Sequence, residues 1–365
     1  MTRIAICTPD LESGDAVSND AVGMYQALTE GGFEARLFAV NTRITWPKVY
    51  KPESIKDFIK NTHDLLLYHH SVGWDIGIHL LQTLQCRKVI KYHNVTPPKY
   101  FAGIAENYFI ACQSGRAQLK DLLTIKGDLY LADSPYSLRE LLGDGKKGLR
   151  GAVVPPFHHI DRLKGIEADD KILHRFDDGK TNLLMVGRVV PNKGHFALVD
   201  VFQTYQCKYN LNSRLFVVGK EDPGLISYTR SLRSKVREFH LENTVLFTGE
   251  TSDRALKAYY SIADVFVITS FHEGFCVPLV EAMSMKIPIV AYGSTAVPDT
   301  VGKAGFVWEE CDPELMAASI DRIVRHKPLR SSLGEMGFRR YQKEFSNDRI
   351  KDCLFESLRK TNLIE

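Results

Sequence analysis

The sequence predicts an α/β protein built from two doubly wound parallel-sheet domains. Short apolar and β-branched runs recur, each followed by a helical pattern: RIAICT, HDLLLYHH, RKVIKYHN and DLYLAD, then NLLMVG, RLFVVG, TVLFTG, DVFVIT and IPIVAY. Strands of this kind that alternate with helices form parallel sheets covered on both faces. The length of 365 residues exceeds what one compact core usually holds.

The boundary between the two predicted domains falls in GAVVPPFHHID. Pro155 and Pro156 fix the backbone there and stop any helix, so we place the linker near residue 156. The expected domains are residues 1–156 and residues 157–340.

Composition narrows the classes of function. A formal net charge of +3, from basic residues dispersed along the chain, argues against nucleic acid as a partner. The seven cysteines are scattered without any C-x-x-C spacing, which argues against a disulfide framework and a zinc site. The start of the chain lacks a signal-peptide pattern, and no run approaches the roughly 20 apolar residues of a spanning helix. We therefore expect a cytoplasmic protein.

In each half of the chain, a loop follows the first predicted strand. In the first half the turn PDLESGDAVSND, with Gly14, leads into the helix AVGMYQALTEGG, which Gly31 and Gly32 would end. In the second half the loop is GRVVPNKG. Neither loop is G-x-G-x-x-G, so a nicotinamide oxidoreductase is disfavoured. Ligands of open parallel sheets sit beyond the carboxyl ends of the strands, and two facing sheets would form one cleft there.

The stretch HEGFCVPLVEAM, residues 272–283, holds two carboxylates, Glu273 and Glu281, around an apolar loop. It follows the strand DVFVIT, and Pro278 suits the first position of a helix because its missing N–H would have no partner there. We therefore expect Glu281 in the first helical turn and Glu273 in the loop before it. The free amides and the helix dipole predict an anion site at Phe275, Cys276 and Val277.

Each carboxylate also has an ordinary explanation: Glu281 could merely complement the helix dipole, and Glu273 could simply be solvated. The loop GRVVPNKG changes the balance, because Arg188 and Lys193 stand at the end of another strand and could reach the same place. A diphosphate leaving group needs such charges, since negative charge grows on it as its bond breaks. The chain has no D-x-D, so metal-bridged binding of a diphosphate is unsupported and we assign no metal.

At this point the sequence resembles a known family. The stretches GRVVPNKG, FVVGKED, VLFTGETSDRALKAYYSIADVFVITSFHEGFCVPLVEAM and VPDTVGKAG resemble the donor half of glycosyltransferase family 4, which are retaining enzymes with the GT-B fold. The resemblance implies two Rossmann-like domains facing across a cleft, a nucleotide sugar held mainly by the second domain, and no metal cofactor. It also implies that the last helix, about residues 341–365, joins the first domain.

The same resemblance assigns roles to single residues. Glu273 is implied to lie at the donor sugar and Glu281 to bind the ribose hydroxyls, while Arg188 and Lys193 match the residues that bind the diphosphate. The remaining donor-binding candidates are the two loop glycines and the amide-bearing residues: Gly187, Gly274, Phe275, Cys276 and Val277.

In the first half, VIKYHNVTPPKYF places His93 at a strand end. The family resemblance implies contact with the donor sugar near its reacting carbon, whereas a histidine bonded within a Pro-rich turn is the alternative. His69 and His70 are expected at the cleft too. Neighbouring histidines cannot easily chelate one metal, and no acidic or cysteine partner stands at ligand spacing. Gly14 could let backbone amides approach a phosphate or the acceptor.

Several positions depart from the family pattern. The first turn reads ESGDAV instead of carrying paired glycines, which leaves Asp15 and Asn19 near the acceptor side. Asp299 stands where a glutamate commonly follows the proline in VPDTVG, and VGKED replaces a more glycine-rich loop. These departures bear on the identity of the donor and leave the predicted fold unchanged.

The sequence thus predicts a retaining, metal-independent glycosyltransferase that uses a GDP- or UDP-sugar, with mannose and glucose as the candidate sugars. The acceptor would be a hydroxyl of a glycan or a lipid-linked saccharide, since YHHS, YHNVTPP and CQSGRAQL resemble enzymes of bacterial surface-polysaccharide assembly. A sugar phosphorylase, a nucleotide-sugar epimerase and a non-catalytic nucleotide-sugar binding subunit stay open as alternatives. Peripheral contact with the inner face of the cell membrane, through Arg116, Lys120 and Lys126, competes with an ordinary solvated helix face.

Overall fold

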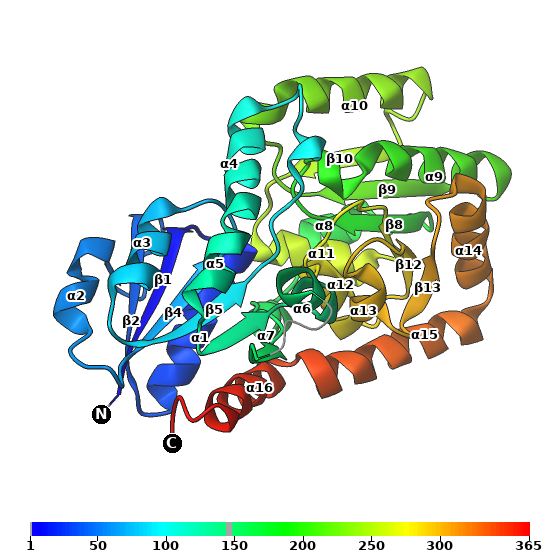
Figure 1. The fold of residues 1–365 in the computed structure, drawn as a ribbon. Helices are drawn as coiled ribbons and strands as arrows, with labels where there is room; N and C mark the ends of the chain where they lie inside the picture. The colour runs from blue at the N-terminus through cyan, green and yellow to red at the C-terminus, as the bar shows by residue number, and fades with distance from the viewer. Residues whose placement is uncertain (1, 144–147) are drawn as a thin grey trace. The chain divides into compact units, whose positions relative to one another are not determined.

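The computed structural model describes residues 2–143 and 148–365, and the chain divides into two compact units. The first unit comprises Met1–Lys99, Asn107–His159 and Ser346–Glu365, and the second comprises Tyr100–Glu106 and Ile160–Phe345. Each unit contains one sheet in which every pair of neighbouring strands is parallel, and Figure 1 shows helices on both faces of each sheet.

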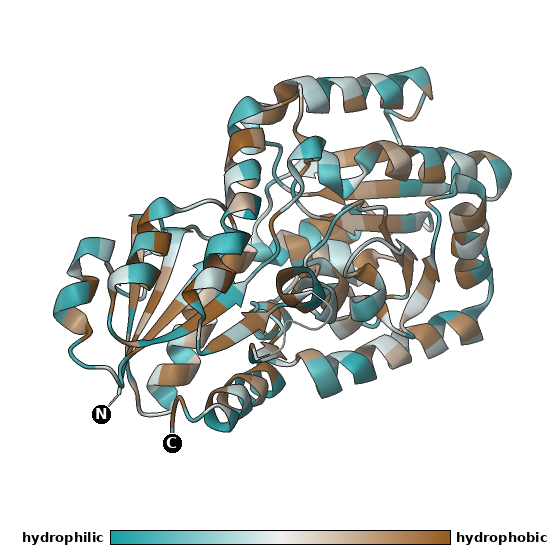
Figure 2. Ribbon diagram, in the orientation of Figure 1, coloured by the Kyte–Doolittle hydropathy of each residue, from teal (hydrophilic) through white to brown (hydrophobic). Residues whose placement is uncertain are grey.

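The sheet of the first unit has seven strands in the order β3-β2-β1-β4-β5-β6-β7. Its strands are β1 (Arg3–Leu11), β2 (Glu34–Thr42), β3 (Val49–Tyr50), β4 (Leu65–His70), β5 (Arg87–Tyr92), β6 (Leu129–Ala132) and β7 (Gly151–Val153). Every residue of β4 is buried, which is why its sequence is a continuous apolar run and does not alternate. Figure 2 shows the same tendency as brown colour along the central strands.

The α-helices of this unit, within the described residues, are α1 (Ala16–Glu30), α2 (Ile55–Phe58), α3 (Asp75–Thr83), α4 (Glu106–Ala117), α5 (Leu119–Ile125), α6 (Pro135–Leu142) and α16 (Asn347–Lys360). α1 begins where the Asp15 carboxylate accepts a hydrogen bond from the Ser18 amide, and it ends at Gly31 and Gly32. α16 packs on the first unit, because Ile350, Leu354 and Leu358 lie in the same apolar cluster as residues of α1 and β1.

The sheet of the second unit has six strands in the order β10-β9-β8-β11-β12-β13. Its strands are β8 (Thr181–Val186), β9 (Ser213–Val218), β10 (Val245–Gly249), β11 (Val265–Ile268), β12 (Ile289–Tyr292) and β13 (Gly305–Trp308). Its helices are α7 (Ile160–Gly165), α8 (Asp170–Arg175), α9 (His195–Lys208), α10 (Ile226–Glu238), α11 (Asp253–Ile262), α12 (Val277–Ser284), α13 (Val297–Val301), α14 (Pro313–Arg325) and α15 (Lys327–Arg340), which continues into one π-helical turn, η5 (Tyr341–Phe345).

The strand order of the second sheet reverses between β8 and β11. β8 connects onward to β9 on one side, whereas β11 begins the series that runs to β13 on the other side. The loops that follow β8 and β11 therefore leave neighbouring strands at the switch point of the sheet, and open parallel sheets generally bind ligands at this carboxyl edge. The sequences GRVVPNKG and SFHEGFC are these two loops.

The structure confirms the predicted pair of parallel sheets and adds strands that the sequence patterns do not single out. The additional strands are β2, β3, β7 and β13, which are only partly buried. The first helix also begins earlier than the apolar pattern suggests, at Ala16, because Asp15 caps it. Within residues 2–143 and 148–365, no helix has the length and apolar character needed to cross a membrane.

Close packing of α1 against the chain near Phe157 gives a test of this fold. A Cβ atom added at Gly23 would lie 2.3 Å from the Phe157 Cβ atom. We expect Gly23→Ala to lower the free energy of unfolding by about 1–3 kcal/mol through overpacking, although alanine is otherwise the better helix former by roughly 1 kcal/mol.

Urea unfolding of Gly23→Ala beside Gly165→Ala measures this effect. Gly165 ends α7 and has no atom within 4 Å of an added Cβ, so that variant should unfold near the wild-type midpoint. Equal midpoints for the two variants would contradict the packing described for α1.

Candidate functional site

The loop after β8 is shaped by two glycines. Gly187 has a φ of 149° and Gly194 a φ of 69°, and between them Pro191–Lys193 form a short 3₁₀ turn. A Cβ at Gly194 would lie 2.0 Å from the Thr269 carbonyl oxygen at the end of β11, so only glycine fits there. The Thr269 hydroxyl donates to the Gly194 carbonyl at 2.9 Å, which ties the two loops together.

An ion pair joins the same two loops. The Lys193 ammonium donates to both carboxylate oxygens of Glu273, at 2.7 Å and 2.8 Å, and Glu273 is only 5% exposed. Burial opposes the charged form of Lys193, but the neighbouring Glu273 carboxylate raises the pKa of the amine above its usual value. Thr295 fixes the glutamate backbone, because its hydroxyl accepts from the Glu273 amide and donates to the Glu273 carbonyl. A fixed pair of opposite charges thus lies at the switch point of the second sheet.

Arg188 lies on the loop that carries Lys193. Its guanidinium donates to the Asp222 carboxylate at 2.9 Å, and its side chain is 54% exposed. Its positive charge is near enough to Lys193 to disfavour the charged amine. The structure therefore brings Arg188, Lys193 and Glu273 to the same region, with Arg188 on the side open to solvent.

The start of α12 differs from the expectation in one respect. Cys276 has a φ of 76° and caps the helix, so Val277 is its first residue and Pro278 its second. Glu281 is consequently the fifth residue and lies in the second turn, which corrects the expected position in the first turn. The amides of Phe275, Cys276 and Val277 donate to no acceptor within the described part of the chain. They remain able to bind an anion together with the helix dipole.

Glu281 lies against α11. The Tyr260 hydroxyl donates to its carboxylate at 2.5 Å. Burial raises the pKa of Glu281, and the hydrogen bond from Tyr260 acts in the opposite direction. The phenol fixes the orientation of the carboxylate, which can still accept hydrogen bonds through its other lone pairs.

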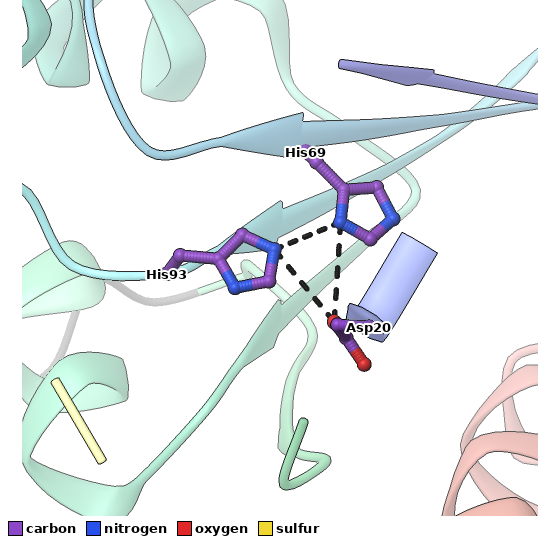
Figure 3. Close-up of side chains that lie close together, drawn as sticks. All are labelled: Asp20, His69 and His93. Atoms are coloured by element: carbon purple, nitrogen blue, oxygen red, sulfur yellow. Dashed lines mark hydrogen bonds and ion pairs between the residues drawn. The ribbon is translucent and has the colours of Figure 1, made fainter. Parts of the chain in front are cut away.

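In the first unit the side chain of His93 belongs to a buried group of ionisable residues (Figure 3). Its Nε2 lies 2.8 Å from Nδ1 of His69, and its Nδ1 lies 3.0 Å from the Asp133 carboxylate. Ligand-type atoms of Asp20, His69 and His93 lie within 4.8 Å of one another. The expectation that the histidines lack an acidic partner is therefore wrong, because the fold brings in Asp20 and Asp133 from distant segments.

His70 points away from this group, since successive residues of a strand face opposite sides of the sheet. One ring nitrogen lies 3.0 Å from the Tyr68 hydroxyl and the other 2.9 Å from the Gly115 carbonyl. Burial lowers the pKa of His70 to about 4. His70 is thus a neutral residue of the interior, on the face of β4 opposite to His69.

Other candidates of the first unit have local roles. Gly14 has a φ of 78° in the turn before α1, and Asp15 caps that helix. Asn19 lies 2.6 Å from the His159 ring. The Arg116 guanidinium donates to Glu140 and to the Val95 carbonyl, so the proposed basic face keeps mainly Lys120 and Lys126 as exposed cations.

The sequence did not predict several side chains that contact Glu273, Glu281 and His93. Tyr260 and Thr295 hold the two glutamates, and Lys91, Asp20 and Asp133 surround the histidines. Asp133 could have been found, because it follows a predicted strand in the same way as His93. Asp20 had no such signal, since it lies inside a helix.

Two parallel-sheet units of this kind, each with its switch point, are the architecture of the GT-B glycosyltransferases. The structure is similar to that of a sucrose-phosphate synthase from Thermosynechococcus elongatus, with a TM-score of 0.79, 20% identity and 99% coverage of both chains. It is also similar to the Anabaena protein HepE, solved in complex with UDP-glucose, with a TM-score of 0.74, 16% identity and coverage of 99% and 100%.

A family model matches part of the chain. Residues 166–340, just under half of the chain, match the family described as Glycosyl transferases group 1. The chain is 30% identical over 183 residues to the capsular polysaccharide biosynthesis glycosyltransferase CapM of Staphylococcus aureus, which is 49% of this chain and 46% of CapM. The chain spans about half the length of the curated relatives it matches.

The raised pKa of Glu281 makes a prediction about stability. As pH rises, the unfolded chain ionises this glutamate first while the folded protein resists, so Glu281 increasingly lowers the free energy of unfolding. Glu281→Gln removes this penalty and keeps an acceptor for Tyr260. The gain in stability should be small below the ordinary carboxyl pKa, grow as pH rises and then level off.

Urea unfolding between about pH 4 and pH 8 measures the difference between variant and wild type. The exposed Glu242, changed to glutamine, serves as the matched control and should show no such trend. A gain for Glu281→Gln that shrinks with rising pH would contradict the burial of an ionised carboxylate at this position.

Proposed function

We propose that this protein is a retaining, metal-independent glycosyltransferase that transfers a sugar from a nucleoside-diphosphate sugar to a hydroxyl group. The observation that carries the proposal is the Lys193–Glu273 ion pair at the switch point of the second sheet, beside the free amides that begin α12. That edge is where open parallel sheets bind ligands. Charges of both signs and amide donors are the groups that a diphosphate and a sugar require.

The diphosphate would lie against Lys193, Arg188 and the start of α12. As the bond to the sugar breaks, negative charge develops on the departing phosphate, and fixed cations and amides stabilise it without rearrangement. The departing phosphate oxygen would itself accept the proton of the attacking hydroxyl on the same face of the sugar. This route keeps the configuration of the reacting carbon and needs no separate enzymic base.

The two glutamates would divide the remaining polar groups of the donor. Glu273, fixed by Lys193 and Thr295, is placed in the loop and would accept from sugar hydroxyls. Glu281, held by Tyr260, would accept from the ribose hydroxyls. Burial of Glu281 disfavours its ionised form, so this carboxylate does not stabilise the fold. Ionisable groups whose pKa is shifted in this way concentrate at functional sites.

The donor would be a GDP- or UDP-sugar, with mannose or glucose as the sugar. The similarity to HepE with UDP-glucose supports a nucleotide sugar, and the match to CapM supports an acceptor glycan or a lipid-linked saccharide. Transfer of sugar to such acceptors would take place in the cytoplasm, where the protein would make peripheral contact with the inner face of the membrane.

The proposal is tested by incubating the protein with UDP- and GDP-sugars and candidate saccharide acceptors in the presence of chelator. We expect glycoside product whose anomeric configuration, read by NMR, equals that of the donor. Lys193→Ala should lower turnover by about 100-fold or more, which is the scale for loss of a charge-stabilising donor. Lys286→Ala, an exposed lysine of the same unit, should keep wild-type turnover.

Because Lys193→Ala leaves the buried Glu273 without its cation, folding of each variant is checked by circular dichroism, and Arg188→Gln provides an exposed substitution with the same expected direction. Full turnover in folded Lys193→Ala would contradict the role of this lysine. Cleavage of a glycoside by inorganic phosphate to a sugar 1-phosphate without any nucleotide sugar, or epimerised donor without acceptor, would replace the proposal by one of the two alternative enzyme classes.

A further inference from the structure

The loop that carries Glu273 is held by residues 295–301, which we call the α13 segment because they comprise the turn into α13 and that helix. α13 and α15 both contact α12 in the second unit (Figure 1). The Thr295 hydroxyl accepts from the Glu273 amide at 2.8 Å and donates to the Glu273 carbonyl at 2.9 Å. The Thr300 hydroxyl donates to the Phe275 carbonyl at 2.7 Å. The α13 segment thus fixes the backbone of the loop at two positions.

Thr295 pays for this contact with an unfavourable backbone conformation. Its φ is 48°, in the left-handed region, where a β-branched residue is an outlier. Such a conformation persists only where the surrounding structure fixes it, and residues of this kind cluster at functional sites. Thr295 can therefore keep both hydrogen bonds to Glu273 only while the rest of the α13 segment is held in place.

Arg340, the last residue of α15, holds the other end of the α13 segment. Its Nε donates to the Thr300 carbonyl at 3.0 Å and its Nη2 donates to the Asp299 carbonyl at 2.7 Å. The last carbonyl groups of a helix lack partners within it, and basic side chains near the helix end commonly bind them. A Cβ atom added at Gly302, just after α13, would lie 2.9 Å from the guanidinium carbon. The guanidinium thus packs directly against the end of α13.

Arg340 is itself fixed by the π-helical turn that follows it. Its Nη1 lies 3.0 Å from the Glu344 carboxylate, and its guanidinium carbon lies 5.2 Å from the centre of the Phe345 ring. Phe345 in turn packs edge-on against Phe275, with ring centres 5.4 Å apart, and both rings are only 5% exposed. The contacts therefore form a closed ring from Arg340 through the α13 segment to the Glu273 loop and back through Phe345.

We propose that Arg340 is a positioning residue for Glu273, which acts through the α13 segment and thereby determines how tightly the protein holds the sugar of its donor. Lys193 fixes the carboxylate of Glu273, whereas Thr295 and Arg340 together fix its backbone. The effect on the sugar rests on the proposed function, in which Glu273 accepts from sugar hydroxyls. The hold of Arg340 on the Glu273 loop does not depend on it.

The ordinary explanation is that Arg340 only stabilises the end of a short helix. A purely structural role would lower the stability of the protein and leave the ligand preference of the folded molecules unchanged. The proposed role affects the sugar and spares the nucleotide, because Glu281, which would bind the ribose, is held separately by Tyr260 of α11. Affinities for a nucleotide with and without its sugar therefore distinguish the two explanations.

Amide hydrogen exchange of the full chain, followed by mass spectrometry, tests the hold on the loop without any ligand. In Arg340→Gln, peptides that cover residues 270–280 and 295–301 should exchange about tenfold faster than in the wild type, the scale for loss of one hydrogen bond to a charged group. Peptides of β9 should keep the wild-type rate. Unchanged exchange around Glu273, or an equal increase throughout the second unit, would overturn the proposal.

The matched control is Arg339→Gln, which changes the exposed neighbour of Arg340 in the same helix and should leave both peptides at the wild-type rate. If Arg340→Gln does not fold, Arg340→Lys takes its place. Lysine keeps the charge but lacks the planar fork that binds two carbonyls and a carboxylate together, so the increase should be smaller and in the same direction.

Calorimetric titration in the presence of chelator tests the effect on the sugar, with UDP, UDP-glucose, GDP and GDP-mannose as ligands. Arg340→Gln should bind the nucleotide sugar about tenfold more weakly than the wild type and the free nucleoside diphosphate equally well. An unchanged ratio of the two affinities in the folded variant would overturn the proposal. Wild-type protein that binds none of the four ligands would remove the proposed function, and the exchange measurement would still decide the hold on the loop.

A double-mutant cycle tests the route through Thr295. Thr295→Val removes the hydroxyl and keeps the branched shape, so it should reproduce the loss of affinity for the nucleotide sugar. Adding Arg340→Gln to Thr295→Val should cause no further loss, because both residues act through the same hydrogen bonds to Glu273. Losses that multiply in the double variant would show that Arg340 acts by another route and would overturn the proposal.

Discussion

The ion pair between Lys193 and Glu273 is the contact on which the loops of the second unit depend. It connects loops that leave neighbouring parallel strands and would otherwise diverge at the switch point. Two local features make it possible: glycine at position 194, where a side chain would collide with Thr269, and the hydroxyl of Thr295 on the Glu273 backbone. A buried carboxylate without its cation would be costly, so each partner fixes the other.

Both units hold buried ionisable side chains at the carboxyl edge of their sheet, but the charges have different partners in each. At the carboxyl edge of the second sheet one lysine neutralises one glutamate, and the amides of α12 are left for a ligand. In the first unit, Lys91 lies between Asp133 and Asp20, and the rings of His69 and His93 lie beside these carboxylates. Buried charges of this kind reduce stability relative to apolar packing, and their concentration at strand ends is better explained by function.

The sequence predicted the strands that are buried on both faces, because such strands are continuous apolar runs. It did not predict β3, β7 and β13, which lie at sheet edges, nor the partly exposed β2. Lys193 and Glu273 each follow a predicted strand, and this was enough to predict that they lie in the same region. Spacing could not reveal the buried group formed by Asp20, His69, Lys91, His93 and Asp133, which come from four separate segments. It also could not reveal the left-handed Cys276, which moves Glu281 into the second turn.

Calorimetric titration of the full chain with UDP, GDP and ADP in the presence of chelator measures whether the second unit binds a nucleoside diphosphate. We expect saturable binding of one diphosphate per chain, with the matching monophosphate bound more weakly because it lacks a phosphate to meet Lys193 and the α12 amides. A correctly folded protein that binds none of these nucleotides would contradict this expectation.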